Sequence, residues 1–95
     1  MKFLEKLGFT KEEIQKFEAE TADVMLMTLS QNKKLVQSNI KYLVELGVQN
    51  ISEIFMTYYE IFLMDHSNFV NIFNKYDRED LVEKLVKNVA IVEYL

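Results

Sequence analysis

The hydrophobic positions of residues 39–62 recur 30 positions further along the chain, in residues 69–92. A third, shorter copy of the pattern occupies residues 3–25. Units of this kind bury their apolar sides against their neighbours in a stack, so the pattern predicts three degenerate helical repeats of about 30–39 residues. The matched pairs of the two longer copies are Ile40 and Val70, Tyr42 and Ile72, Leu43 and Phe73, Leu46 and Tyr76, Ile51 and Leu81, Phe55 and Leu85, Ile61 and Ile91, and Phe62 and Val92.

Within each copy the apolar residues follow the spacing of an α-helix, and helix-breaking residues are rare. The chain has no Pro, and its two Gly residues, Gly8 and Gly47, each follow a leucine, as expected for residues that end a helix in the left-handed conformation. We therefore predict an all-α fold, a compact stack of about six or seven short helices in a single domain of residues 1–95. The predicted helices cover residues 2–7, 11–19, 22–30, 32–46, 51–59, 66–75 and 78–94.

Polar residues mark the starts of several predicted helices. Thr10 and Glu13 have the spacing of a capping box, in which each side chain accepts a hydrogen bond from the other residue's backbone N–H. Asn50 and Glu53 have the same spacing, with Asn as the cap. Asp77 precedes further acids in a first turn, where the helix dipole favours negative charge.

Composition and charge narrow the class of protein. Hydrophobic residues make up 49% of the chain and aromatic residues 13%, which is enough for a packed core. The net charge of −4 comes entirely from residues 49–95, because residues 1–48 contain equal numbers of acids and lysines. The absence of Cys fits a reducing compartment, and no stretch approaches the ~20 apolar residues of a membrane span. We expect a cytoplasmic protein without membrane contact.

The residues that the copies share form a recognisable motif: Phe3, Leu4, Leu7, Gly8 and Ile14 in one copy, Tyr42, Leu43, Leu46, Gly47, Ile51, Ile54, Ile61, Phe62 and Leu63 in the next, and the weaker segment from Phe73 to Val92. This motif resembles the repeat of the mitochondrial transcription termination factor family. The resemblance implies a curved stack of short helical units, which in that family binds nucleic acid on a basic face. The family usually has Pro at the start of each third helix, where this chain has Ala22, Tyr59 and Val89, and the acidic surface here also departs from the family. The resemblance therefore extends to the fold only.

No group of residues in the sequence predicts catalysis. His66, the only histidine, stands between Asp65 and Ser67, and three adjacent residues cannot converge as a catalytic triad. Asp65 or Ser67 is instead expected to cap a helix, with His66 exposed. Two isolated glycines exclude a phosphate-binding loop, and the acids of residues 12–23 lack the spacing of a calcium loop. We predict a protein without enzymatic activity, cofactor or metal.

The first functional hypothesis is a small adaptor or inhibitor that binds a larger macromolecule through an acidic and aromatic helical surface. The acidic second half would attract a protein partner with a basic surface and accelerate their encounter. Exposed Tyr and Met residues suit a groove that accepts a partner helix. Most of the aromatic and methionine residues considered for this role are expected to lie in the core: Met25, Met27, Phe55, Met56, Tyr58, Tyr59, Phe62, Met64, Phe69, Phe73 and Tyr76. The residues predicted to contact the partner are Glu53, Tyr58, Tyr59, Glu60, Glu79, Asp80 and Glu83.

Two alternatives involve other surfaces. Residues 24–44 contain no acid, and Lys33, Lys34 and Lys41 could there contact the phosphates of a nucleic acid. The other alternative is homo-oligomerisation through one apolar face of the final helix. That face would consist of Val82, Leu85, Val89, Val92 and Leu95.

Overall fold

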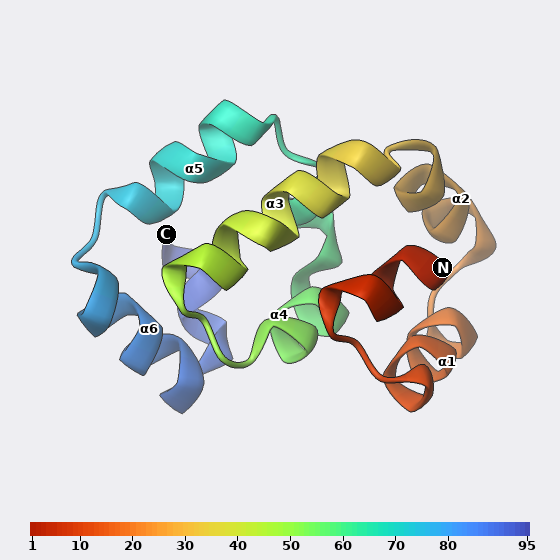
Figure 1. Cartoon of the computed structure of the whole chain (residues 1–95), viewed down its shortest axis with the longest axis horizontal. Helices are drawn as coiled ribbons and strands as arrows, with labels where there is room; N and C mark the ends of the chain where they lie inside the picture. The colour runs from red at the N-terminus through yellow and green to blue at the C-terminus, as the bar shows by residue number, and fades with distance from the viewer.

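Every regular element of the protein is helical, in a computed structural model that describes all 95 residues (Figure 1). The chain forms six α-helices and three 3-10 helices, and no strand is present, so the predicted all-α fold is confirmed. The elements are η1 (Lys2–Leu7), α1 (Lys11–Glu20), α2 (Asp23–Gln31), α3 (Lys33–Leu46), α4 (Ile51–Tyr58), η2 (Tyr59–Leu63), α5 (His66–Asn74), α6 (Arg78–Lys87) and η3 (Val89–Tyr94).

Helix α3 is the longest element and crosses the middle of the molecule, where η1, η2, α4 and α5 pack against it (Figure 1). Val36, Ile40 and Leu43 lie at helical spacing on its inner side and are completely buried. They belong to a single core of 18 buried hydrophobic residues, to which all three segments of the repeat pattern contribute. Helix α3 therefore holds the two ends of the stack together.

A chain of aromatic rings connects the N-terminal helices with α5. The ring centroids of Phe17 and Phe55 are 5.0 Å apart, those of Phe55 and Phe62 are 5.2 Å apart, and those of Phe62 and Phe69 are 5.5 Å apart. The chain ends at Phe73, 4.8 Å from Phe69. Tilted pairs at these distances each add about 0.5–1.5 kcal/mol beyond the burial of their area.

Most of the predicted helix boundaries have the expected chemistry. The Thr10 backbone N–H donates to Glu13 Oε1 at 2.9 Å, and the Glu13 N–H donates to Thr10 Oγ1 at 3.1 Å, which completes the capping box. The side chains of Asp65 and Asp77 accept backbone N–H groups at the starts of α5 and α6. Gly47 has a φ of 92°, which suits Gly because it has no Cβ, and ends α3 as predicted.

Asn50 stands at the N-cap position of α4 as predicted, but its side chain does not make the expected capping hydrogen bond. Its side chain accepts no hydrogen bond from the first turn of α4. The Nδ2 group instead donates to Glu53 Oε1 at 3.0 Å and to the backbone carbonyl of Leu85 at 2.9 Å. The Asn50 side chain is therefore used to join α4 to α6.

The prediction of a single helix over residues 78–94 is wrong. Helix α6 ends at Lys87, and Asn88 adopts an extended conformation with φ −154° and ψ 100°. The Asn88 side chain accepts the Ala90 N–H at 3.1 Å and so starts η3. Residues 54–63 are helical as predicted, but they divide between α4 and η2 after Tyr58, and Met64 is extended beyond the end of η2. The second and third copies of the pattern thus have the same order of elements, and the repeat itself stays a prediction.

Candidate functional site

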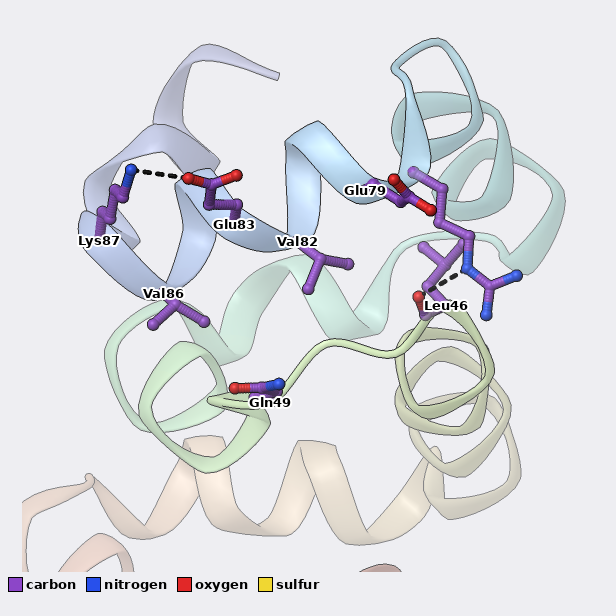
Figure 2. Close-up of a pocket in the computed structure, with 8 residues that line it drawn as sticks. Leu46, Gln49, Glu79, Val82, Glu83, Val86 and Lys87 are labelled. Carbon is purple, nitrogen blue, oxygen red and sulfur yellow. Dashed lines mark hydrogen bonds and ion pairs between the residues drawn. The ribbon is translucent and has the colours of Figure 1, made fainter.

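A groove of about 410 Å³ lies between α6 and the turn that connects α3 with α4 (Figure 2). We call it the α6 groove. Its α6 side presents Glu79, Val82, Glu83 and Val86, which recur every three or four residues and so share one face of the helix. The remaining residues that line the groove are Leu46, Gln49, Arg78 and Lys87.

The burial of the opposite face of α6 determines which of its residues face the groove. Leu81 and Leu85 are buried in the core, with 3% and 0% of their surface exposed. Two hydrogen bonds from one side chain then tie the start of α6 to the end of α3. Arg78 donates from Nε to the Leu46 carbonyl at 2.8 Å and from Nη2 to the Glu45 carbonyl at 2.7 Å. These carbonyls belong to the last turn of α3, where backbone acceptors have no partner within the helix.

The floor of the α6 groove is apolar and open to solvent. Val86 exposes 49% of its surface, and Val82 and Leu46 are half-buried. Figure 2 shows Val82 and Val86 on the side of α6 that faces Gln49. Three aliphatic side chains therefore line the same groove, and the protein leaves each of them at least partly exposed.

Charges surround this floor, and most of them have partners within the molecule. Lys87 Nζ lies 2.8 Å from Glu83 Oε1, and this contact raises the pKa of Lys87. Arg78 is held by the carbonyls of α3. Glu79 alone among the four charged residues makes neither an ion pair nor a side-chain hydrogen bond. Glu79 is therefore the one charged side chain of the lining without a partner, although Arg78 keeps its positive charge because backbone carbonyls are neutral.

The residues predicted to contact a protein partner do not form one surface. Glu79 and Glu83 line the α6 groove, whereas exposed Asp80 pairs with Lys84 at 2.9 Å outside it. The other four lie on different elements. Glu53 lines a hollow between α1 and α4, and Tyr58, Tyr59 and Glu60 line a small hollow at the junction of α4 and η2.

The hollow between α1 and α4 contains carboxylates but also their internal partners. The pKa of Glu13 is lowered because the Ser52 hydroxyl and the Thr10 backbone N–H donate to its carboxylate. Lys16 lines the same hollow. Glu13 thus serves to cap α1 and to join it to α4.

A second large pocket, of about 460 Å³, lies between η2, α5 and η3. We call it the apolar pocket. The Tyr58 hydroxyl donates to Glu93 Oε2 at 2.7 Å across its lining, and this contact raises the pKa of Tyr58. The pocket shares no residue with the α6 groove. Its lining consists of Tyr58, Ile61, Met64, Phe69, Ile72, Phe73, Val92, Glu93 and Leu95.

The residues predicted for self-association do not share one exposed helix face. Leu85 is completely buried and Val92 exposes only 8% of its surface, because both belong to the core. The break at Asn88 separates Val82, which lines the α6 groove, from Leu95, which lines the apolar pocket. Val89 is half-buried against the core.

The three predicted phosphate contacts are exposed on α3. Lys33 Nζ lies 5.9 Å from the centroid of the Phe3 ring, so this ammonium already has a partner. Lys34 and Lys41 make no ion pair. The Ser38 hydroxyl between them donates to the Lys34 carbonyl at 3.0 Å, which leaves it as an acceptor only.

Sequence analysis did not identify Asn39, the only polar residue in the buried core. Its Nδ2 group donates to the carbonyls of Phe62 and Met64 at 2.9 and 3.0 Å. Its Oδ1 atom lies 2.8 Å from His66 Nδ1, which must therefore carry the proton and donate. The sequence signal that could have identified Asn39 is its position, as a polar residue, on the apolar side of α3 next to Ile40. Asn39 fixes η2 and the start of α5, and His66 is exposed as predicted.

Comparisons with known proteins found no relative of this chain. No family model, no curated protein and no solved structure matches the chain. The structure contains no group of three or more His, Cys, Asp or Glu side chains that could hold a metal ion. None of the helices is both long enough and apolar enough to cross a membrane.

Proposed function

We propose that this chain is a non-enzymatic interaction protein that binds an amphipathic, positively charged helix of a larger protein in the α6 groove. The observation that carries the proposal is the exposed aliphatic floor next to Glu79, a carboxylate without an internal partner. An adaptor or an inhibitor of the larger protein would act through the same contact.

The shape of the groove supports a helical partner. Val82 and Val86 are one turn apart on α6, and Leu46 lies across from them. A partner helix with apolar residues at positions i, i+3 or i+4, and i+7 would bury this surface. Burial of an aliphatic side chain that the free protein leaves in water contributes about 1.5–3 kcal/mol.

The charge distribution supports a basic partner. Residues 49–95 carry the entire net charge of −4, and Glu79 stands at the edge of the groove within this half. A Lys or Arg on the partner could pair with Glu79 without breaking an existing ion pair. Charges at the edge of an interface mainly accelerate association and select among partners.

A designed helical peptide with Leu on one face and Lys on the other tests the proposal. Calorimetry would measure its affinity, and amide chemical shifts would locate its site. We expect binding that weakens with salt, with the largest shifts on α6 and around Gln49. A matched peptide with Glu in place of Lys should not bind. Equal binding of the two peptides, or shifts outside the groove, would contradict the proposal.

Charge reversal at Glu79 provides the residue-level test. Glu79→Lys should weaken binding of the Lys peptide roughly tenfold, because it replaces an attraction with a repulsion. Glu60→Lys is the matched control, since it changes the net charge equally on η2, outside the groove. Equal effects of the two variants would show that only the overall charge matters.

A second candidate is nucleic-acid binding through α3, favoured by the exposed and unpaired ammonium groups of Lys34 and Lys41. Replacement of Lys33, Lys34 and Lys41 by Gln should then lower the affinity for single-stranded DNA and flatten its dependence on salt. An unchanged salt dependence would remove these lysines from any such site.

A further inference from the structure

The apolar pocket has the size and lining of a small-molecule site. Its volume of about 460 Å³ falls within the range of about 300–1,000 Å³ that such sites have. Eight of its nine lining residues are hydrophobic. Ile61, Met64 and Ile72 are half-buried there, so their side chains are accessible from the pocket. An aliphatic group would be well accommodated among them.

Glu93 is the one charged residue of this lining. Its Oε2 atom accepts the Tyr58 hydroxyl, and no cation of the protein pairs with it. The residue is exposed, so the carboxylate stands at the solvent side of the pocket. A ligand that enters the pocket would therefore meet one unpaired negative charge at its polar end.

Aromatic rings complete the recognition chemistry at this site. Tyr58, Phe69 and Phe73 all line the pocket together with Glu93. The negative face of an aromatic ring attracts organic ammonium groups, and a nearby carboxylate adds to that attraction. An anionic ligand would be repelled by Glu93, and a neutral one would leave its charge without a partner.

We propose that the apolar pocket binds a small organic cation, an ammonium group attached to an aliphatic chain. The chain would lie among Ile61, Met64 and Ile72, and the ammonium would contact the Glu93 carboxylate and the ring of Tyr58. This site is separate from the α6 groove, so it can be tested independently of the proposed partner.

Octylammonium, octanol and octanoate are suitable ligands for the test because they share one chain and differ in charge. Titration of the full-length protein, followed by the methyl signals of Met64 and the ring signals of Tyr58, would give the three affinities. We expect octylammonium to bind roughly tenfold more tightly than octanol, and octanoate to bind most weakly. Glu93→Gln keeps an acceptor for Tyr58 but removes the charge, so it should abolish the preference for the cation.

Glu60→Gln is the control, because it removes one carboxylate from η2 without changing the pocket lining. It should leave the preference for octylammonium unchanged. Ile72→Trp should fill the pocket and weaken all three ligands, and circular dichroism would show that the variant remains folded. The assignment is overturned by equal binding of octylammonium and octanoate, by an unchanged preference in Glu93→Gln, or by tighter binding of a Lys-containing peptide than of octylammonium.

Discussion

The α6 groove and the apolar pocket have similar volumes, about 410 and 460 Å³, but opposite chemistry. The groove has four charged residues around an aliphatic floor, whereas the pocket has one charged residue in a hydrophobic lining. Both depend on the last 18 residues of the chain, because α6 forms one and η3 contributes to the other. The comparison teaches that one short break in a helix can direct neighbouring segments to two different kinds of surface.

The two hollows are also held by different contacts. The α6 groove is tied by side chains that donate to backbone carbonyls, from Arg78 to the end of α3 and from Asn50 to Leu85. The apolar pocket is supported from inside by Asn39, which holds η2 and the start of α5, and the bond between Tyr58 and Glu93 forms part of its outer side. Variants of these residues should therefore affect one hollow more than the other.

The largest expected effect is that of Asn39→Ala. This change leaves the buried carbonyls of Phe62 and Met64 without their donor, and it should lower the free energy of unfolding by about 3 kcal/mol. Urea denaturation would measure the loss. Native-state hydrogen exchange should show faster opening of η2 and α5 than of α6. Equal acceleration throughout the chain would contradict a specific role of Asn39 beside the apolar pocket.

A smaller loss of about 1 kcal/mol is expected for Asn50→Ala, and it should affect the α6 groove. The change removes the donor to Leu85, but it also removes Oδ1, a buried acceptor without a partner. These two effects oppose each other, which limits the loss. Denaturation would measure it, and binding of the Lys peptide should weaken while octylammonium binding is retained. A loss as large as that of Asn39→Ala would show that Asn50 Oδ1 also accepts a hydrogen bond in the folded protein.

The fold class and several helix ends could be predicted because they depend on local patterns. The capping box of Thr10 and the cap at Asp77 each involve residues within one helical turn. The role of Asn50 could not be predicted, because its partner Leu85 is 35 residues away in the sequence. The site shows the same limit. Glu79 and Val82 share one face of α6 by their spacing, but only the packing of α6 beside Leu46 and Gln49 makes that face one side of a groove.

The break at Asn88 was missed for a different reason. The apolar spacing continues from Leu85 through Val89 to Val92, and Asn within a helix costs only a few tenths of a kcal/mol by propensity. The helix nevertheless ends there, because the Asn88 side chain accepts the Ala90 N–H. This local hydrogen bond competes with continuation of the helix. Packing then places Val92 in the core from η3, as the repeat pattern would require of a short third helix.

Asn88→Ala tests whether this cap keeps the two hollows apart. The variant loses the side-chain acceptor at the start of η3, which should cost about 1 kcal/mol or slightly less. Because η3 contributes to the apolar pocket and α6 alone forms the helical side of the groove, octylammonium binding should weaken more than binding of the Lys peptide. Asn88→Asp is the control, since Asp is an equally good cap. Identical behaviour of the two variants would reject the role of the cap.

The smallest effect concerns the pH dependence of the bond between Tyr58 and Glu93. The Glu93 carboxylate accepts the Tyr58 hydroxyl and raises the pKa of Tyr58 above its ordinary value of 10.0. A raised pKa means that the folded protein favours the neutral phenol. The contribution of this bond to stability is therefore complete below pH 10 and disappears as the pH rises through the raised pKa. Phenolate absorbance should show one tyrosine that ionises later than the rest, and Glu93→Gln should bring its pKa back toward 10.0 because the anionic acceptor is lost. A Tyr58→Phe variant should lack the late transition; if it persists, another tyrosine is responsible and the outer side of the apolar pocket is held by other contacts.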